Sequence, residues 1–145
     1  MTEKLPILIV ADEALIPSYA QPGDAGADLR AAEAGVIKPG QRMLVSTGVS
    51  VAIPFGYVGL VHPRSGLAAK HGITVLNAPG TVDSGYRGEI KVNLLNTSSE
   101  EWAFVVGDRI AQIVFQKFET ADFIPVAALP GSDRGESGHG STGVK

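Results

Sequence analysis

The chain has 145 residues, a size typical of one domain that can bury a substantial core. Its 19% of charged residues and formal net charge of −3 give no basic surface for duplex nucleic acid or an anionic membrane. It contains no cysteine, which excludes disulfides, thiolate metal sites and cysteine nucleophiles. We therefore expect one globular, cytoplasmic domain with no nucleic-acid or membrane partner.

Short strands are predicted along most of the chain, and in residues 49–53, 57–60 and 89–94 apolar and polar residues alternate with a period of two, as in half-buried strands. The strand candidates are residues 5–10, 41–45, 49–53, 57–60, 89–94, 102–106 and 110–118. The first run is too short for a secretory signal or a membrane span. Glycine and proline turn signals separate the runs. The pattern predicts an all-β sandwich or barrel and disfavours ferredoxin-like and doubly wound folds, since helices that could cover a parallel sheet are absent.

One short helix is predicted over residues 65–72, SGLAAKHG. Ser65 is the expected N-cap, and Gly72 suits the left-handed position that ends a helix. From Pro130 onward the chain becomes polar and rich in glycine, which is typical of a mobile terminus. We therefore expect a β domain over residues 1–130 and a flexible arm over residues 131–145.

The segment AGADLRA at residues 25–31 contains the first candidate functional side chain, Asp28. It is either a turn aspartate that bonds to its own backbone or a carboxylate that orders water around hydrated Mg²⁺. The segment PRSGLAAKHG at residues 63–72 places Arg64 and Ser65 at the start of the helix. Unpaired N–H groups and the helix dipole attract anions there, and a guanidinium matches phosphate geometry. Ser65 would cap the helix whether the segment is purely structural or binds phosphate, so capping does not distinguish these two roles.

The segment NAPGTVDSGYRGEIKVNL at residues 77–94 predicts a hairpin of two strands around a glycine-rich turn. Asn77 offers the donors and acceptor that can read the edge of a base. Asp83 is a candidate general base for a water molecule, and Tyr86 offers a flat ring to a sugar. The structural alternative is a hairpin closed by an ordinary Asp-Ser-Gly turn.

Two further segments contain polar side chains in a suggestive order. GDRIAQIVF at residues 107–115 contains Arg109 and Gln112, which are otherwise typical of a solvated strand start. RGESGHGSTG at residues 134–143 contains a guanidinium that can grip phosphate, a planar imidazole and two hydroxyls, and the alternative is a disordered tail. These arm residues are Arg134, His139, Ser141 and Thr142.

In this order the five segments resemble the five motifs of the trimeric deoxyuridine triphosphate nucleotidohydrolases, the dUTPases. The resemblance runs from about residue 20 to the end of the chain, and the third segment is the most specific. It implies a jelly-roll fold and Mg²⁺-dependent hydrolysis of dUTP to dUMP and pyrophosphate, which limits uracil incorporation into DNA and supplies the dTMP precursor. It also implies a homotrimer with three shared active sites.

The resemblance implies a role for each matching residue. Asp83 would activate the attacking water, Tyr86 would pack on deoxyribose and Asp28 would reach Mg²⁺ through water only. Uracil would be read by Asn77 with Gly80, Thr81 and Val82, and Lys91 would contact substrate. Phosphates would be held by Arg64, Ser65, Gly66 and Gln112 of a neighbouring subunit. The arm would close over substrate, with Arg134 on the γ-phosphate, His139 on uracil, and Ser141 and Thr142 near phosphate oxygens.

The arm departs from the usual family pattern. His139 stands where most relatives have Phe, and Ser137 stands where they have Gly. Histidine stacks more weakly than phenylalanine, and its charge depends on pH. Glu136 adds a negative charge near the triphosphate, so we expect phosphate binding to depend more on Arg64 and Arg134.

Three other functions fit parts of the pattern. A deoxycytidine triphosphate deaminase shares the fold, but Asn93 stands where such enzymes place a proton-shuttling Glu. A nucleotide-binding regulator without catalysis would not need Asp83 and the arm. A purely structural β domain would have no use for clustered Arg64, Asp83 and Arg134. We leave His62 and His71 as structural residues.

Overall fold

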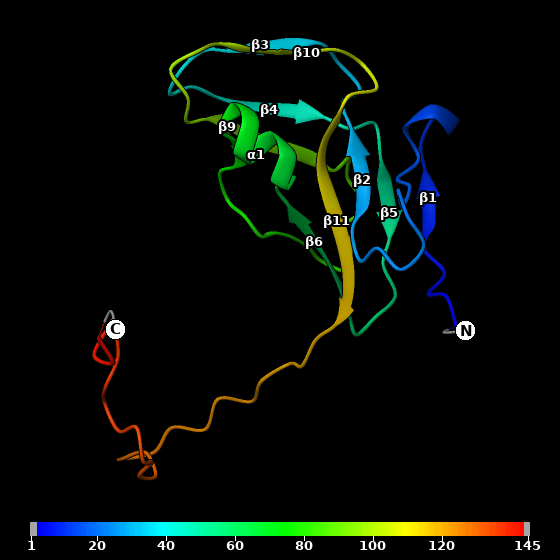
Figure 1. Cartoon of the computed structure of the whole chain (residues 1–145). Helices are drawn as coiled ribbons and strands as arrows, with labels where there is room; N and C mark the ends of the chain where they lie inside the picture. Colours follow the sequence, from blue (N-terminus) through cyan, green and yellow to red (C-terminus); the bar gives the residue numbers. More distant parts are fainter. Residues whose placement is uncertain (1–2, 144–145) are drawn as a thin grey trace.

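The computed structural model describes residues 3–143 and consists of short antiparallel strands with one α-helix (Figure 1), which confirms the predicted all-β class. The predicted end points of the domain and arm, residues 1 and 145, lie outside the described residues. The strands are β1 (Leu8–Val10), β2 (Ala27–Arg30), β3 (Gly35–Ile37), β4 (Arg42–Ser46), β5 (Ser50–Ala52), β6 (Tyr57–His62), β7 (Ile73–Val75), β8 (Gly80–Val82), β9 (Lys91–Asn96), β10 (Trp102–Phe104) and β11 (Arg109–Lys117).

The strands form a four-stranded sheet in the order β2-β11-β6-β8, a three-stranded sheet in the order β4-β9-β7, and the pairs β1-β5 and β3-β10. Every pairing is antiparallel. β11 lies inside the larger sheet, with Ile113 opposite Ala27 of β2 and opposite Val61 of β6. One hydrophobic core joins the sheets, and its largest fully buried apolar side chains are Leu29, Ile37, Ile73, Leu94, Ile110 and Ile113.

The seven predicted strands are present, with ends shifted by a few residues. β2, β3 and β7 were not predicted, because three or four residues are too few to establish a period, and β8 was expected only as the first strand of the hairpin in residues 77–94. The turn interpretation of Asp28 is wrong. Asp28 lies in β2 opposite Gln112, its N–H donates to Ser18 O at 2.8 Å, and the residue is 9% exposed.

The predicted helix is confirmed as α1 (Ser65–His71), and Gly72 ends it in the left-handed conformation with φ 64°. The predicted N-cap is wrong, because Arg64 occupies the cap position and no side chain caps the helix. Ser65 is already the first helical residue, so its hydroxyl does not take the capping role. Among residues 3–143 there is no helix long and apolar enough to cross a bilayer.

The predicted hairpin around Asp83 is also wrong. β8 pairs with β6, whereas β9 pairs with β4 and β7, so the two flanking strands belong to different sheets. Residues 83–90 cross from one sheet to the other, and we call this segment the crossover loop. Alternation within each strand identified the strands but carried no information about their partners.

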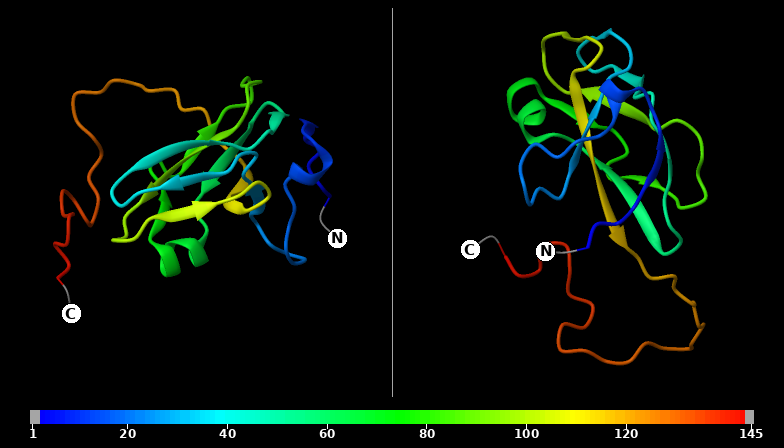
Figure 2. Two further views of the ribbon diagram at one scale, coloured as in Figure 1. Left: turned by 90° about the horizontal axis from the view of Figure 1, so that it is seen from above. Right: turned by 90° about the vertical axis from the view of Figure 1, so that its right-hand side faces the viewer.

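After Lys117 the chain leaves the body, and residues 119–143 extend away from the sheets, as Figure 1 and the right-hand view of Figure 2 show. The hydrogen bonds of the arm are local, such as Gly135 N–H to Ser132 O and Arg134 Nε to Ser137 O. Between the body and the arm, large apolar side chains are exposed: Phe118, Phe123, Ile124, Val126 and Leu129.

Asn96 is a fully buried polar side chain that anchors the turn after β9. Its amide donates to Ile37 O and Glu100 O, both at 2.8 Å, and accepts from Ser98 N–H and Oγ. We expect Asn96→Ala to lower the free energy of unfolding by about 2–4 kcal/mol, because these buried groups lose their partners. Urea denaturation measures this, with the exposed Ser99→Ala as control, and a loss below about 0.5 kcal/mol would contradict it.

Candidate active site

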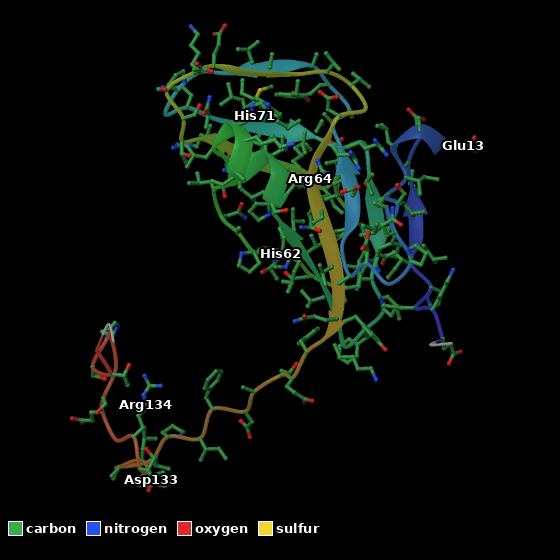
Figure 3. All side chains as sticks on the ribbon, viewed as in Figure 1. Glu13, His62, Arg64, His71, Asp133 and Arg134 are labelled. Atoms are coloured by element: carbon green, nitrogen blue, oxygen red, sulfur yellow. The ribbon has the colours of Figure 1, made fainter. Side chains whose placement is uncertain are left out.

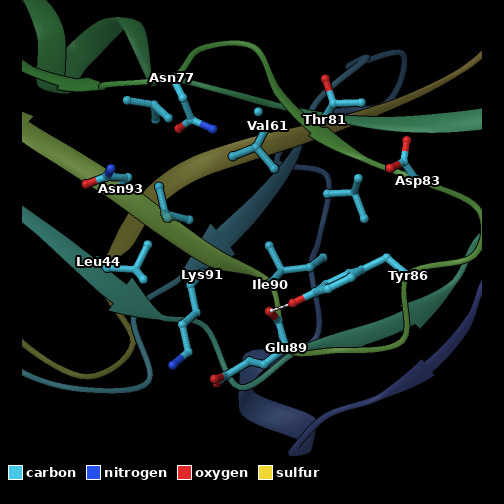
Figure 4. A pocket seen from close by; sticks show the side chains of 14 residues that line it. Leu44, Val61, Asn77, Thr81, Asp83, Tyr86, Glu89, Ile90, Lys91 and Asn93 are labelled. Atoms are coloured by element: carbon cyan, nitrogen blue, oxygen red, sulfur yellow. Dashed lines mark hydrogen bonds between the residues drawn. The ribbon is translucent and has the colours of Figure 1, made fainter.

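A cavity of about 660 Å³ opens between β8, β9 and the crossover loop, and we call it the loop cavity (Figure 4). It is lined by all seven residues predicted from the third segment, namely Asn77, Gly80, Thr81, Val82, Asp83, Tyr86 and Lys91. The geometry therefore brings this group together. Leu44, Val61, Glu89 and Ile90 also line it and were missed, because their contribution depends on how the two sheets meet.

Asp83 is exposed at the start of the crossover loop, just after β8. Its carboxylate makes no hydrogen bond or ion pair with the described residues, so both oxygens are available to a water molecule. Figure 4 places Asn77 and Asp83 on either side of Thr81, with Tyr86 reaching across the cavity. Both polar and apolar side chains line the cavity. Lys91 is the one cationic side chain among these lining residues.

A second cavity of about 590 Å³, which we call the arginine cavity, contains a different group of predicted residues. Asp28, Arg64, Ser65, Gly66 and Gln112 all line it. Ser65 and Gly66 are exposed and begin α1, where the backbone N–H groups have no partner within the helix. This cavity combines a guanidinium with polar groups and is suited to an anion.

Asp28 pairs with Arg64 in the arginine cavity and with Arg109 beside it. Its Oδ1 lies 3.2 Å from Arg64 Nε, and its Oδ2 lies 3.4 Å from Arg109 Nη1. Gln112 Nε2 donates to Pro63 O at 3.0 Å, which fixes the amide beside them. From the sequence, Arg109 is typical of a solvated strand start, and the structure pairs it with Asp28 of β2, a strand that periodicity does not reveal.

Gly26 permits the close approach of Gln112. A Cβ at this position would lie 2.1 Å from Gln112 Oε1 and 2.9 Å from its Cδ. Any larger side chain at residue 26 would have to displace that amide from the cavity. The glycine of the AGADLRA segment therefore has a packing reason within the site.

The two cavities lie on opposite sides of β6. Val61 lines the loop cavity and His62 lines the arginine cavity, and successive strand residues point to opposite faces. Within one chain, therefore, Arg64 and Asp83 belong to separate cavities. Arg134 lies on the arm, away from the cluster around Arg64 and His62 (Figure 3). One copy of the chain separates the predicted residues into three groups.

The described residues contain no cluster of three His, Asp or Glu side chains that could hold a metal ion directly. The nearest candidate is the single carboxylate of Asp28, which is engaged by two arginines. A carboxylate accepts about four hydrogen bonds, so Asp28 retains capacity for water. The Asp28 carboxylate is therefore able to contact a hydrated ion through water.

The sequence matches the dUTPase family over residues 12–143. It is 64% identical over 127 residues to the deoxyuridine 5'-triphosphate nucleotidohydrolase of Bifidobacterium longum, covering 87% of this chain and 80% of that protein. A Staphylococcus bacteriophage 80alpha dUTPase variant with dUpNHpp superposes with a TM-score of 0.88 at 27% identity, covering 96% and 99% of the chains. A dUTPase variant from phage phi11 of S. aureus, described with a structural Mg(II) ion, gives 0.79 at 25% identity, covering 87% and 99%. The chain therefore belongs to the dUTPase family.

Proposed function

We propose that this protein hydrolyses dUTP to dUMP and pyrophosphate by attack of water on the α-phosphorus. The activity would limit uracil incorporation into DNA and supply the dTMP precursor. The observation that carries the proposal is the loop cavity, where the carboxylate of Asp83, without a hydrogen-bond or ion-pair partner among residues 3–143, lies beside polar groups suited to a base. The family membership and the 64% identity to a dUTP nucleotidohydrolase support it.

The loop cavity would bind the nucleoside. Asn77 and the backbone from Gly80 to Val82 supply the donors and acceptors that read uracil, while Tyr86 forms the wall against deoxyribose. Asp83 accepts the proton of the attacking water as it adds to phosphorus, and pyrophosphate leaves from the opposite side. Lys91 supplies the cationic contact from β9.

The triphosphate needs more positive charge than the loop cavity offers. Arg64, Ser65, Gly66 and Gln112 supply it, and these groups come from a second copy because they lie beyond β6 in the same chain. We therefore propose a homotrimer with three shared sites. The exposed apolar side chains at Phe123, Ile124 and Leu129 support this assembly, because a neighbouring subunit would cover them.

We propose Mg²⁺ as the cofactor, and the phage phi11 relative is described with a structural Mg(II) ion. Mg²⁺ usually keeps several waters and binds through few carboxylates together with substrate phosphates. Asp28 suits this mode, since it would accept hydrogen bonds from metal-bound water while it orients Arg64. When bound, the ion supplies neutralisation of charge on the phosphate oxygens.

The arm of residues 131–145 would close the site after substrate binds. Arg134 grips the γ-phosphate, His139 stacks on uracil, and Ser141 and Thr142 bond to phosphate oxygens. The arm makes only local hydrogen bonds between residues 131 and 143, so it is free to order on substrate. Ordering costs conformational entropy, which the contacts made by the correct nucleotide offset.

Pyrophosphate release from dUTP, dTTP, dCTP and UTP with Mg²⁺ tests the proposed function. We expect selective cleavage of dUTP, since a thymine methyl or a 2′-hydroxyl would clash with the crossover loop. Ammonia release from dCTP would instead identify a deaminase, which Asn93 in the loop cavity disfavours because an amide cannot shuttle protons. Binding of dUTP without cleavage would identify a regulator.

A further inference from the structure

We propose that Glu89 is a positioning residue for sugar selection: its carboxylate, bound to residues 46–48, holds the Tyr86 ring rigidly against the ribose position. This inference rests on the proposed function, because it concerns how the same site refuses a 2′-hydroxyl. Glu89 was not among the residues expected from the sequence. Its role comes from contacts between the crossover loop and the chain that joins β4 to β5.

The Glu89 carboxylate is tied to this connection by several hydrogen bonds. Ser46 Oγ lies 2.9 Å from both carboxylate oxygens, and Gly48 N–H donates to Oε1 at 2.8 Å. The side chain is half-buried, and hydrogen bonds to an ionised acceptor are roughly twice as strong as neutral ones. Its fixed position is therefore set from outside the crossover loop.

The next residue is held by the same connection. Thr47 Oγ1 donates to Ile90 O, and Ile90 N–H donates to Val49 O at 2.7 Å. Thr47, Val49 and Ile90 are all buried. The end of the crossover loop is thus fixed at two consecutive residues, Glu89 and Ile90.

The Tyr86 ring leans on this fixed end. Its hydroxyl donates to Glu89 O at 2.8 Å (Figure 4), the hydrogen bond that fixes the far edge of the ring. Gly88 lies directly beneath, since a Cβ there would be 2.5 Å from the Tyr86 hydroxyl oxygen and 2.7 Å from Cζ. Tyr86 is 46% exposed, so packing against other side chains alone would not hold its ring in place.

Rigidity of this wall decides sugar selection. UTP and dUTP differ by one oxygen atom, so a ring that yields by about 1 Å would admit the ribonucleotide, and functional groups need placement within about 0.5 Å. The carboxylate of Glu89 fixes the carbonyl that receives the tyrosine hydroxyl. Loss of the carboxylate would keep the hydrogen bond of Tyr86 but would leave its acceptor carbonyl held only through Ile90, so the ring would move more.

The test compares kcat/KM for dUTP with kcat/KM for UTP in Glu89→Ala, Ser46→Ala and Glu101→Gln. We expect Glu89→Ala to lower this ratio about tenfold through faster UTP cleavage, and Ser46→Ala to lower it by a smaller factor. Glu101 is exposed and makes no side-chain hydrogen bond among the described residues, so its variant should keep the wild-type ratio. A merely structural role would lower both rates together and leave the ratio unchanged, which would overturn the proposal.

A second readout does not depend on activity. The chain has three tyrosines, so fluorotyrosine labelling gives three ¹⁹F signals, and Tyr86→Phe assigns one of them. Glu89→Ala should shift or broaden that signal, whereas Glu101→Gln should not. An unchanged signal overturns the proposal even if the ratio falls. A wild type that does not cleave dUTP would refute the proposed function, while the Tyr86 signal would still test the contact with Glu89.

Discussion

Asp83→Asn is expected to lower kcat for dUTP hydrolysis by about 10²–10⁴-fold, the usual contribution of a general base. Asparagine keeps the size of the side chain but cannot take a proton from water. The carboxylate has no hydrogen-bond or ion-pair partner among residues 3–143, so its loss should leave the fold intact. Pyrophosphate release gives kcat, and calorimetry with dUpNHpp gives the binding affinity, which we expect to change less than about threefold.

The matched control for this variant is Asp12→Asn. Asp12 is exposed and its side chain makes no capping hydrogen bond. The substitution Asp12→Asn therefore removes the same charge as Asp83→Asn, at a residue that does not line the loop cavity. The control variant should turn over dUTP at the wild-type rate. An Asp83→Asn enzyme with more than half of wild-type kcat would exclude Asp83 as the general base.

Co-expression of two impaired variants, Arg64→Ala and Asp83→Asn, is expected to restore activity if sites are shared between subunits. Arg64→Ala should lower kcat/KM about 10²-fold, because it removes a guanidinium from the phosphates and leaves Asp28 with one ion pair. Co-expression with Asp83→Asn places an intact Arg64 beside an intact Asp83 in mixed trimers. For random assembly of closed trimers, roughly one quarter of all sites would be intact.

The double variant carrying both substitutions on one chain is the control for complementation. Co-expressed with itself, it should stay inactive. Purified single variants mixed without subunit exchange should also stay inactive. Activity no higher than that of the better single variant, in confirmed mixed trimers, would show that Arg64 and Asp83 do not meet across an interface.

Sequence patterns predicted the fold class and seven strands because alternation, short apolar runs and the turn signals between them are local features of the sequence. They did not predict how the strands pair. The crossover loop illustrates the limit: Gly80–Val82 and Lys91–Asn96 flank a turn like the arms of a hairpin, yet they pair with β6 and with β4 and β7. Partner choice depends on distant segments, which local periodicity does not encode.

The predicted site residues lie in contiguous segments, so local patterns could group them. All seven site residues predicted in the third segment line one cavity, and the residues expected to bind phosphates line another. What could not be predicted were contacts between segments. The Arg109–Asp28 pair spans 81 positions, and the Ser46–Glu89 contact spans 43. Neither pair has a local signature, since each depends on which strands become neighbours.

The position of β11 inside the four-stranded sheet constrains the order in which this sheet can fold. β11 is the last strand of the chain, yet it holds β2 and β6 together and contributes Gln112 to the arginine cavity. During synthesis on the ribosome, β2 has no sheet partner until about 80 further residues have emerged, so the domain cannot close progressively from its N-terminus. Pairing over such separations also slows folding. The nascent chain therefore exposes the edges of β2 and β6 until its final strand is released.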